Sequence, residues 1–151
     1  MDRAAKLQVV EAILERVSEV ICDITDPVMA EFYRSEPEAE QLFKQHRPVD
    51  TVWLEAGMVE QALYCFMRWH ESPGEIEMSM LGSVPHHAET LAVSVDHYRK
   101  LINATATVIR NVIPPENSLE IELWDEITNS LHKIVDLASE DVIETKLASF
   151  V

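Results

Sequence analysis

Glycine and cysteine are both scarce in this chain of 151 residues, which contains three glycines and two cysteines. Cys22 and Cys65 lie far apart in the sequence, so no disulfide framework is expected, and we predict two reduced thiols. The chain also has no apolar run of about 18 residues, so we expect no membrane-spanning helix. A chain of this length buries enough surface to fold as one domain, residues 1–151, without a disulfide or a structural metal.

Basic residues are few as well. The chain has 12 Lys and Arg against 27 Asp and Glu, which gives a formal net charge of −15. This balance argues against binding to nucleic acid or to an anionic membrane surface, because both need Lys and Arg to neutralise phosphates. The N-terminal stretch MDRAAKLQVVEAILERVSEV has charges scattered through it, unlike a signal peptide. We therefore expect a cytoplasmic protein whose acidity promotes solubility.

Strand-like alternation is absent, and apolar residues recur at spacings of three and four nearly throughout. This pattern predicts an all-α protein of seven to eight helices of unequal length, joined by short corners marked by proline. The first expected helix covers residues 3–22, the second follows an N-cap at Thr25 or Asp26, and the third is a short helix capped by Ser35 that ends near Phe43. Longer helices are expected over residues 50–70, 95–113 and 118 to as far as 147. Residues 76–90 are expected to form a less regular helix, interrupted by Gly82 and Pro85.

Three of the six histidines lie in VPHHAETLAVSVDHY, residues 84–98. His86 and His87 are adjacent, so on a helix only one of them can face a given partner. Pro85 directly precedes them and cannot sit comfortably inside a helix, so we expect the helix to break or begin there. We interpret His97 as a residue near the N-terminus of its own helix. The chain shows no Cys and His cluster with metal-ligand spacing, no phosphate loop and no paired carboxylates that would indicate catalysis.

Three pieces of the sequence together resemble the globin family, over roughly residues 17–138. FYRSEPEAEQLF (32–43) is similar to the globin stretch in which an aromatic pair, a proline and a Leu-Phe lead into a corner. HHAETLAVSVDHY (86–98) is similar to the segment that runs from the proximal histidine to the next helix. LWDEI (123–127) is similar to the start of the last globin helix, with Trp124 as a core anchor. The resemblance implies a globin-like fold.

The resemblance also implies haem b as cofactor, with His87 as the proximal iron ligand and His86 as the alternative. His87 lies six residues before Val93, which would lie beneath the haem. A neutral imidazole is the ligand that globins use, and its second N–H needs an acceptor that fixes the ring. Porphyrin is a flat apolar plate, so its walls need apolar side chains. The implied cofactor-binding residues are His87, Phe43, Val93, Tyr98, Met29, Trp53, Leu54, Met58 and Val59.

The distal side departs from the globin pattern, because the candidate positions offer no standard donor to bound dioxygen. Trp53 could donate only through its indole N–H, and Leu54, Met58 and Met29 donate nothing. The sequence therefore predicts an apolar pocket that holds dioxygen weakly and suits NO or CO, which depend less on hydrogen bonds.

The resemblance implies two functions. The first is reversible binding of O₂, NO or CO, as a gas binder or a stand-alone sensor. With no reductase, kinase or cyclase domain in the sequence, any signal is expected to pass to a partner, for example through a homodimer formed by the last two helices. Enzyme activity is not expected, although NO dioxygenase or peroxidase chemistry at the iron stays open. The alternative is a haem-free globin-like regulatory module that binds a fatty acid or a protein partner in its apolar pocket.

Overall fold

A computed structural model describes the backbone of residues 1–90 and 94–148, and the side-chain surroundings of residues 1–85 and 94–140. These residues form helices and no strand, which confirms the all-α prediction. The seven helices of the described chain are α1 (Arg3–Val20), α2 (Thr25–Ser35), α3 (Pro37–His46), α4 (Thr51–Arg68), α5 (Pro73–Thr90), α6 (Val95–Arg110) and α7 (Ser118–Ala148). Each of them is too short or too polar to traverse a bilayer.

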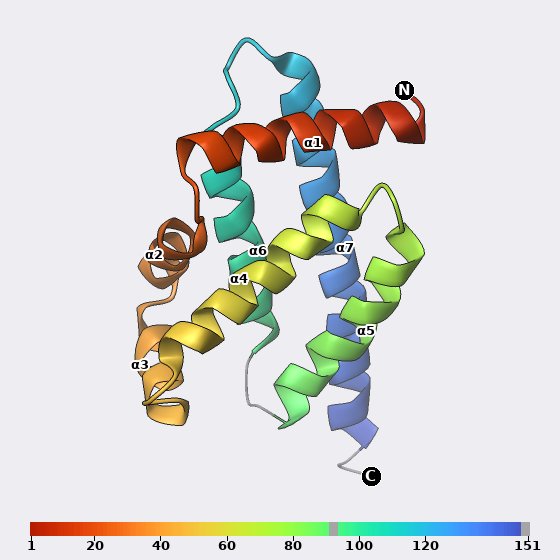
Figure 1. Ribbon diagram of the computed structural model, residues 1–151. Coiled ribbons are helices and arrows are strands. Elements are labelled where there is room, and N and C mark those ends of the chain that lie inside the picture. The colour runs from red at the N-terminus through yellow and green to blue at the C-terminus, as the bar shows by residue number, and fades with distance from the viewer. Residues whose placement is uncertain (91–93, 149–151) are drawn as a thin grey trace.

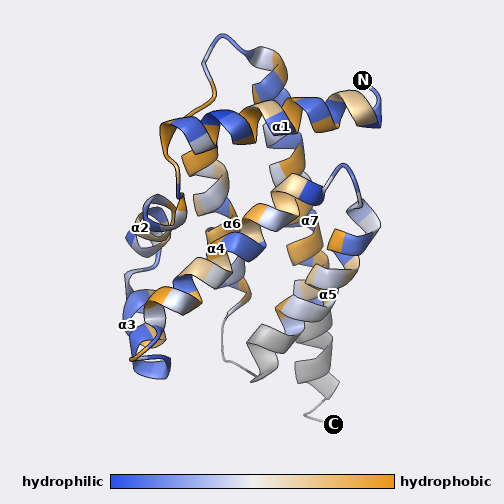
Figure 2. Cartoon of the chain, viewed as in Figure 1, coloured by the Kyte–Doolittle hydropathy of each residue, from blue (hydrophilic) through white to orange (hydrophobic). Residues whose placement is uncertain are grey.

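In Figure 1, α5, α6 and α7 run in roughly similar directions, α1 lies across α6 and α7, and α4 runs obliquely to both. The most extensive contacts join α5 to α7, α2 to α6, and α6 to α7. Helix α1 contacts α4, α6 and α7, and α4 contacts α2, α5, α6 and α7. The short helices α2 and α3 form the corner that leads into α4. Apolar and polar residues alternate along these helices, as expected when each helix buries one face (Figure 2).

Trp124 on α7 lies at the centre of this core and is fully buried. Its indole stacks on the ring of Phe66 from α4, with the ring centroids 4.6 Å apart and 17° between the planes. The indole N–H donates to the carbonyl oxygen of Ala106 on α6, at 3.1 Å. One side chain therefore joins three helices, in agreement with the expectation that Trp124 is a core anchor.

The ends of the first helices differ from the expected ones. Helix α1 stops at Val20, because Cys22 takes a left-handed conformation (φ 68°) that closes the helix. Ser35 is not an N-cap: it is the last residue of α2, where its hydroxyl donates to the carbonyl of Phe32, and Glu36 precedes α3 instead. Thr25 likewise lies inside the first turn of α2. The Ser35 hydroxyl thus satisfies a backbone carbonyl of its own helix, and the backbone N–H of Thr25 donates to the Asp23 carboxylate at 2.9 Å.

The predicted interruption of the fifth helix at Gly82 and Pro85 is wrong, because α5 continues through both to Thr90. Proline inside a helix removes one backbone hydrogen bond and crowds the preceding turn. Here Ile76, Met80 and Val84 repeat at a spacing of four and are 1–2% exposed. We infer that the burial of this stripe, made largely against α7, offsets the cost of the proline.

The two cysteines lie in different environments, and this predicts their reactivity. Cys22 is exposed, whereas Cys65 on α4 is partly buried, and burial raises the pKa of its thiol to about 11. The thiolate is the reactive form, so at pH 8 we expect one thiol, Cys22, to react quickly with a thiol reagent and Cys65 to react far more slowly. Cys22→Ser should remove the fast phase, and in denaturant Cys65 should react freely. Equal rates for both thiols in the native protein would contradict the burial of Cys65.

Candidate functional site

The residues implied as a cofactor site are distributed over five helices. Their positions are Met29 in α2, Phe43 in α3, Trp53, Leu54, Met58 and Val59 in α4, His86 and His87 in α5, and Tyr98 in α6. Val93 lies outside the described residues, and the side chains of His86 and His87 lie outside them too. The backbone nevertheless assigns both histidines to the last turns of α5.

Helices α4, α5 and α6 meet close to the position of the histidine pair. The Tyr98 hydroxyl on α6 and the Ser83 hydroxyl on α5 lie 2.8 Å apart in a hydrogen bond. Burial raises the pKa of Tyr98, the Ser83 contact lowers it, and the nearby Cys65 thiol on α4 raises it further. Ser83 precedes His87 by four residues, about one helical turn. The start of α6 is therefore fixed against α5 one turn before the histidine predicted as a ligand.

Leu54 and Met58 lie one turn apart on α4, and both are half-buried against the core. Their face of α4 is less covered than the face that carries Val59, Ala62 and Phe66, which is buried. The sequence spacing predicts a stripe of Leu54, Met58, Ala62, Cys65 and Trp69, and these residues are partly buried except for Ala62, which is buried with the other face. A partly covered apolar face is the kind of surface that a flat apolar ligand can use.

One polar contact borders this face. The Tyr33 hydroxyl on α2 donates to the Glu55 carboxylate on α4, at 3.0 Å. Burial, together with the bond to Glu55, raises the pKa of the Tyr33 phenol above its usual range. At neutral pH the Tyr33 phenol therefore keeps its proton and donates it in the hydrogen bond to Glu55. Leu54 and Met58 are partly buried and pack against the hydrophobic core.

Other residues of the implied site lie either in the hydrophobic core or on the exposed surface. Phe43, Met29 and Val59 are 4%, 3% and 2% exposed and belong to the hydrophobic core. Phe43 stacks on Phe32, with centroids 6.1 Å apart and 6° between the rings. Trp53 is 82% exposed. The structure therefore does not bring Trp53 together with Leu54 and Met58, and the proposed indole donor on the distal side is not supported.

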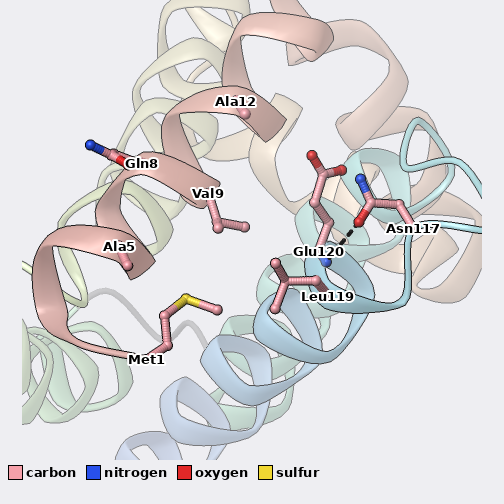
Figure 3. Close-up of a pocket in the computed structure, with 8 residues that line it drawn as sticks. All are labelled: Met1, Ala5, Gln8, Val9, Ala12, Asn117, Leu119 and Glu120. Atoms are coloured by element: carbon pink, nitrogen blue, oxygen red, sulfur yellow. Dashed lines mark hydrogen bonds between the residues drawn. The ribbon is translucent and has the colours of Figure 1, made fainter.

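Two hollows among the described residues lie away from this region. One of about 370 Å³ lies between α1 and the start of α7 (Figure 3). It is lined by Met1, Ala5, Gln8, Val9, Ala12, Asn117, Leu119 and Glu120. A second, of about 400 Å³, is lined by Met1, Arg3, Lys6, Trp69, His70, Pro73, Glu126 and Ser130. Neither hollow contains a residue of the implied haem site.

The described residues fit a haem group in part. The half-buried side chains of Leu54 and Met58 on α4, Leu81 on α5 and Tyr98 on α6 have the right chemistry for the walls of a haem site. Phe43 and Met29 would have to become partly uncovered to touch a porphyrin. The fit thus rests on the partly covered face of α4 and on its closeness to α5 and α6.

A second group of polar residues was missed by the sequence analysis. Glu36 and Glu38, at the start of α3, lie beside His97 in the first turn of α6. About sixty residues of sequence separate the carboxylates from the imidazole, so no local spacing could reveal them. Only the packing of α2 on α6 brings them together.

No protein-family model, curated protein or solved structure matches this chain. Its function is therefore inferred from its own residues.

Proposed function

We propose that this protein is a globin-like haem protein that reversibly binds O₂, NO or CO at iron held by His87. Three observations carry the proposal. Both histidines lie in the last turns of α5, the Tyr98 hydroxyl on α6 is hydrogen-bonded to Ser83 one turn before His87, and the partly buried Cys65 on α4 lies near Tyr98. A ligand histidine, a rigid attachment for its helix and an apolar wall are the parts that a haem site needs.

The arrangement of the helices supports the same proposal. Helix α2 crosses α6, α6 pairs with α7, and α5 packs along α7, while the short α3 turns the chain into α4. Globins pack their helices in pairs around a haem pocket, with short helices at the corners. A four-helix bundle would need neither the short helices nor these crossings.

In this proposal His87 is the iron ligand, and Leu54 and Met58 form the distal wall. A haem group held there would supply iron as the atom that binds the gas. The apolar wall excludes water and offers no hydrogen bond to the gas, since the Tyr33 proton is held by Glu55. We therefore expect weak stabilisation of O₂ and relatively strong binding of NO and CO. Signalling through a homodimer of α6 and α7 stays a prediction.

The test is the visible absorption spectrum of the protein expressed with ample haem, recorded before and after dithionite and CO. We expect a strong Soret band that shifts when CO binds. His87→Ala should abolish the CO-responsive band, whereas His86→Ala, the matched neighbour, should retain it. The reverse pattern would assign the ligand to His86. A purified protein that is colourless and does not take up hemin in a one-to-one ratio would contradict the proposal.

One observation favours a second candidate, a haem-free globin-like module. A porphyrin would have to contact Phe43, Met29 and Val59, but these side chains are buried in the hydrophobic core. Such a module would bind a fatty acid or a protein partner through the apolar face of α4. Native mass spectrometry of the colourless protein would then detect a bound lipid, or a complex with a partner protein.

A further inference from the structure

The Glu36, Glu38 and His97 side chains converge at the junction of α2, α3 and α6. Each offers one ligand atom, and these atoms all lie within 4.8 Å of one another. Glu36 Oε2 lies 3.6 Å from His97 Nε2. Glu36 directly precedes α3, Glu38 is in its first turn, and His97 is in the first turn of α6. The three ligand atoms thus come from two helices that the fold holds against a common neighbour, α2.

Two side chains of the cluster are largely buried and the third is exposed, so the cluster is accessible to solvent from one side. The side chains of Glu36 and His97 are only 10% and 14% exposed, whereas Glu38 is exposed. His97 Nδ1 is sealed from solvent and has no hydrogen-bond partner among the described residues. The other ring nitrogen, Nε2, is directed at the Glu36 carboxylate. An ion arriving from the Glu38 side would therefore meet two ligands already in position.

The net charge of the cluster is compatible with a bound cation. Lys100 forms an ion pair with Oε1 of Glu36, so Oε2 is left on the His97 side. Two carboxylates and one ammonium group carry one net negative charge. A lysine on one carboxylate oxygen can orient a ligand whose other oxygen binds a metal.

We propose that Glu36, Glu38 and His97 bind a Zn²⁺ ion that ties α3 to α6. An imidazole nitrogen with two carboxylate oxygens suits zinc better than Mg²⁺ or Ca²⁺, which prefer oxygen alone. Zinc–nitrogen and zinc–oxygen bonds of about 2.0–2.2 Å set tetrahedral ligand atoms about 3.4 Å apart. The 3.6 Å between Glu36 and His97 matches this spacing. A small movement of the exposed Glu38 completes three ligands, and water takes the fourth position. This site is independent of the proposed haem function.

The experiment is titration of the full chain, stripped with a chelator, with ZnCl₂, followed by calorimetry and by the thermal unfolding midpoint. We expect one Zn²⁺ per chain with a Kd on the order of 1 μM, and a higher midpoint because zinc binds only the folded site. Glu38→Gln removes a ligand on the surface without disturbing the core and should weaken Zn²⁺ binding about tenfold or more. His97→Gln should abolish it.

Two variants serve as matched controls. Glu40→Gln changes a half-exposed glutamate on the same helix, which is paired with Lys44, and His46→Gln changes an exposed histidine at its other end. Both should bind Zn²⁺ like the unaltered protein. Binding that is unaffected by Glu38→Gln, or lost equally in His46→Gln, would show a different site and overturn the proposal. So would the absence of a one-to-one phase in the unaltered protein.

Discussion

Trp124→Ala is expected to lower the free energy of unfolding by about 4 kcal/mol, because it empties the centre of the core. The indole is fully buried and stacks on Phe66, so both the apolar contact and the stacking are lost. The carbonyl of Ala106 also loses its donor. At roughly 3 °C per kcal/mol for a chain of this length, the midpoint of thermal unfolding should fall by about 10 °C. Denaturant unfolding followed by circular dichroism measures the change.

Trp53→Ala is the matched control, since Trp53 is 82% exposed. It removes the same side chain from the surface, and such substitutions usually change stability by about 0.5 kcal/mol or less. Similar losses in the two variants would show that Trp124 is not at the centre of the core. Trp124→Phe should fall between Ala and the unaltered protein, because it keeps an aromatic ring but not the N–H donor.

Arg16→Met is expected to cost about 3 kcal/mol, since it leaves a carboxylate buried without its partner. Arg16 on α1 donates two hydrogen bonds to Glu120 on α7, at 2.6 and 2.9 Å, and the Glu120 side chain is 7% exposed. These hydrogen bonds raise the pKa of the Arg16 guanidinium. The pair is one of the contacts that hold α1 against the start of α7, so its loss should also expose the hollow beside them.

Arg34→Met tests whether burial causes this effect. Arg34 pairs with Glu31 in the same helix, with the arginine side chain 72% exposed, and surface pairs contribute about 0.5 kcal/mol. The double variant Arg16→Met with Glu120→Leu should recover part of the loss, because no charge is then left buried. An Arg16→Met protein as stable as Arg34→Met would mean that water reaches Glu120 in solution.

Local pattern predicted much of the secondary structure. The prolines and apolar spacing indicated where α4, α6 and α7 begin, and α3 begins at Pro37. The ends were less predictable. The end of α1 depends on the left-handed backbone of Cys22, which no spacing reveals. The continuity of α5 through Pro85 depends on its contact with α7, which outweighs the local preference of proline.

The candidate site was predictable only in its residue types. The sequence indicated an apolar set with a histidine pair. Tyr98 is hydrogen-bonded to Ser83, one turn before that pair, and Leu54 and Met58 are half-buried on α4. The sequence could not distinguish Trp53 from Leu54, which are neighbours in sequence but point to different surroundings. The orientation of α4 about its own axis decides which of them is exposed, and that orientation is set by the burial of Val59, Ala62 and Phe66.

The sequence by itself determined the helical class, the acidic surface and the apolar character of the segments, because these follow from composition and from spacing along one helix. Tertiary structure alone decided which polar groups meet. The pairing of Arg16 with Glu120 and the convergence of Glu36, Glu38 and His97 join residues far apart in the chain. A local sequence pattern cannot predict such pairs, because the distance between their side chains depends on how whole helices cross. Those crossings are set by the packing of many buried side chains at once.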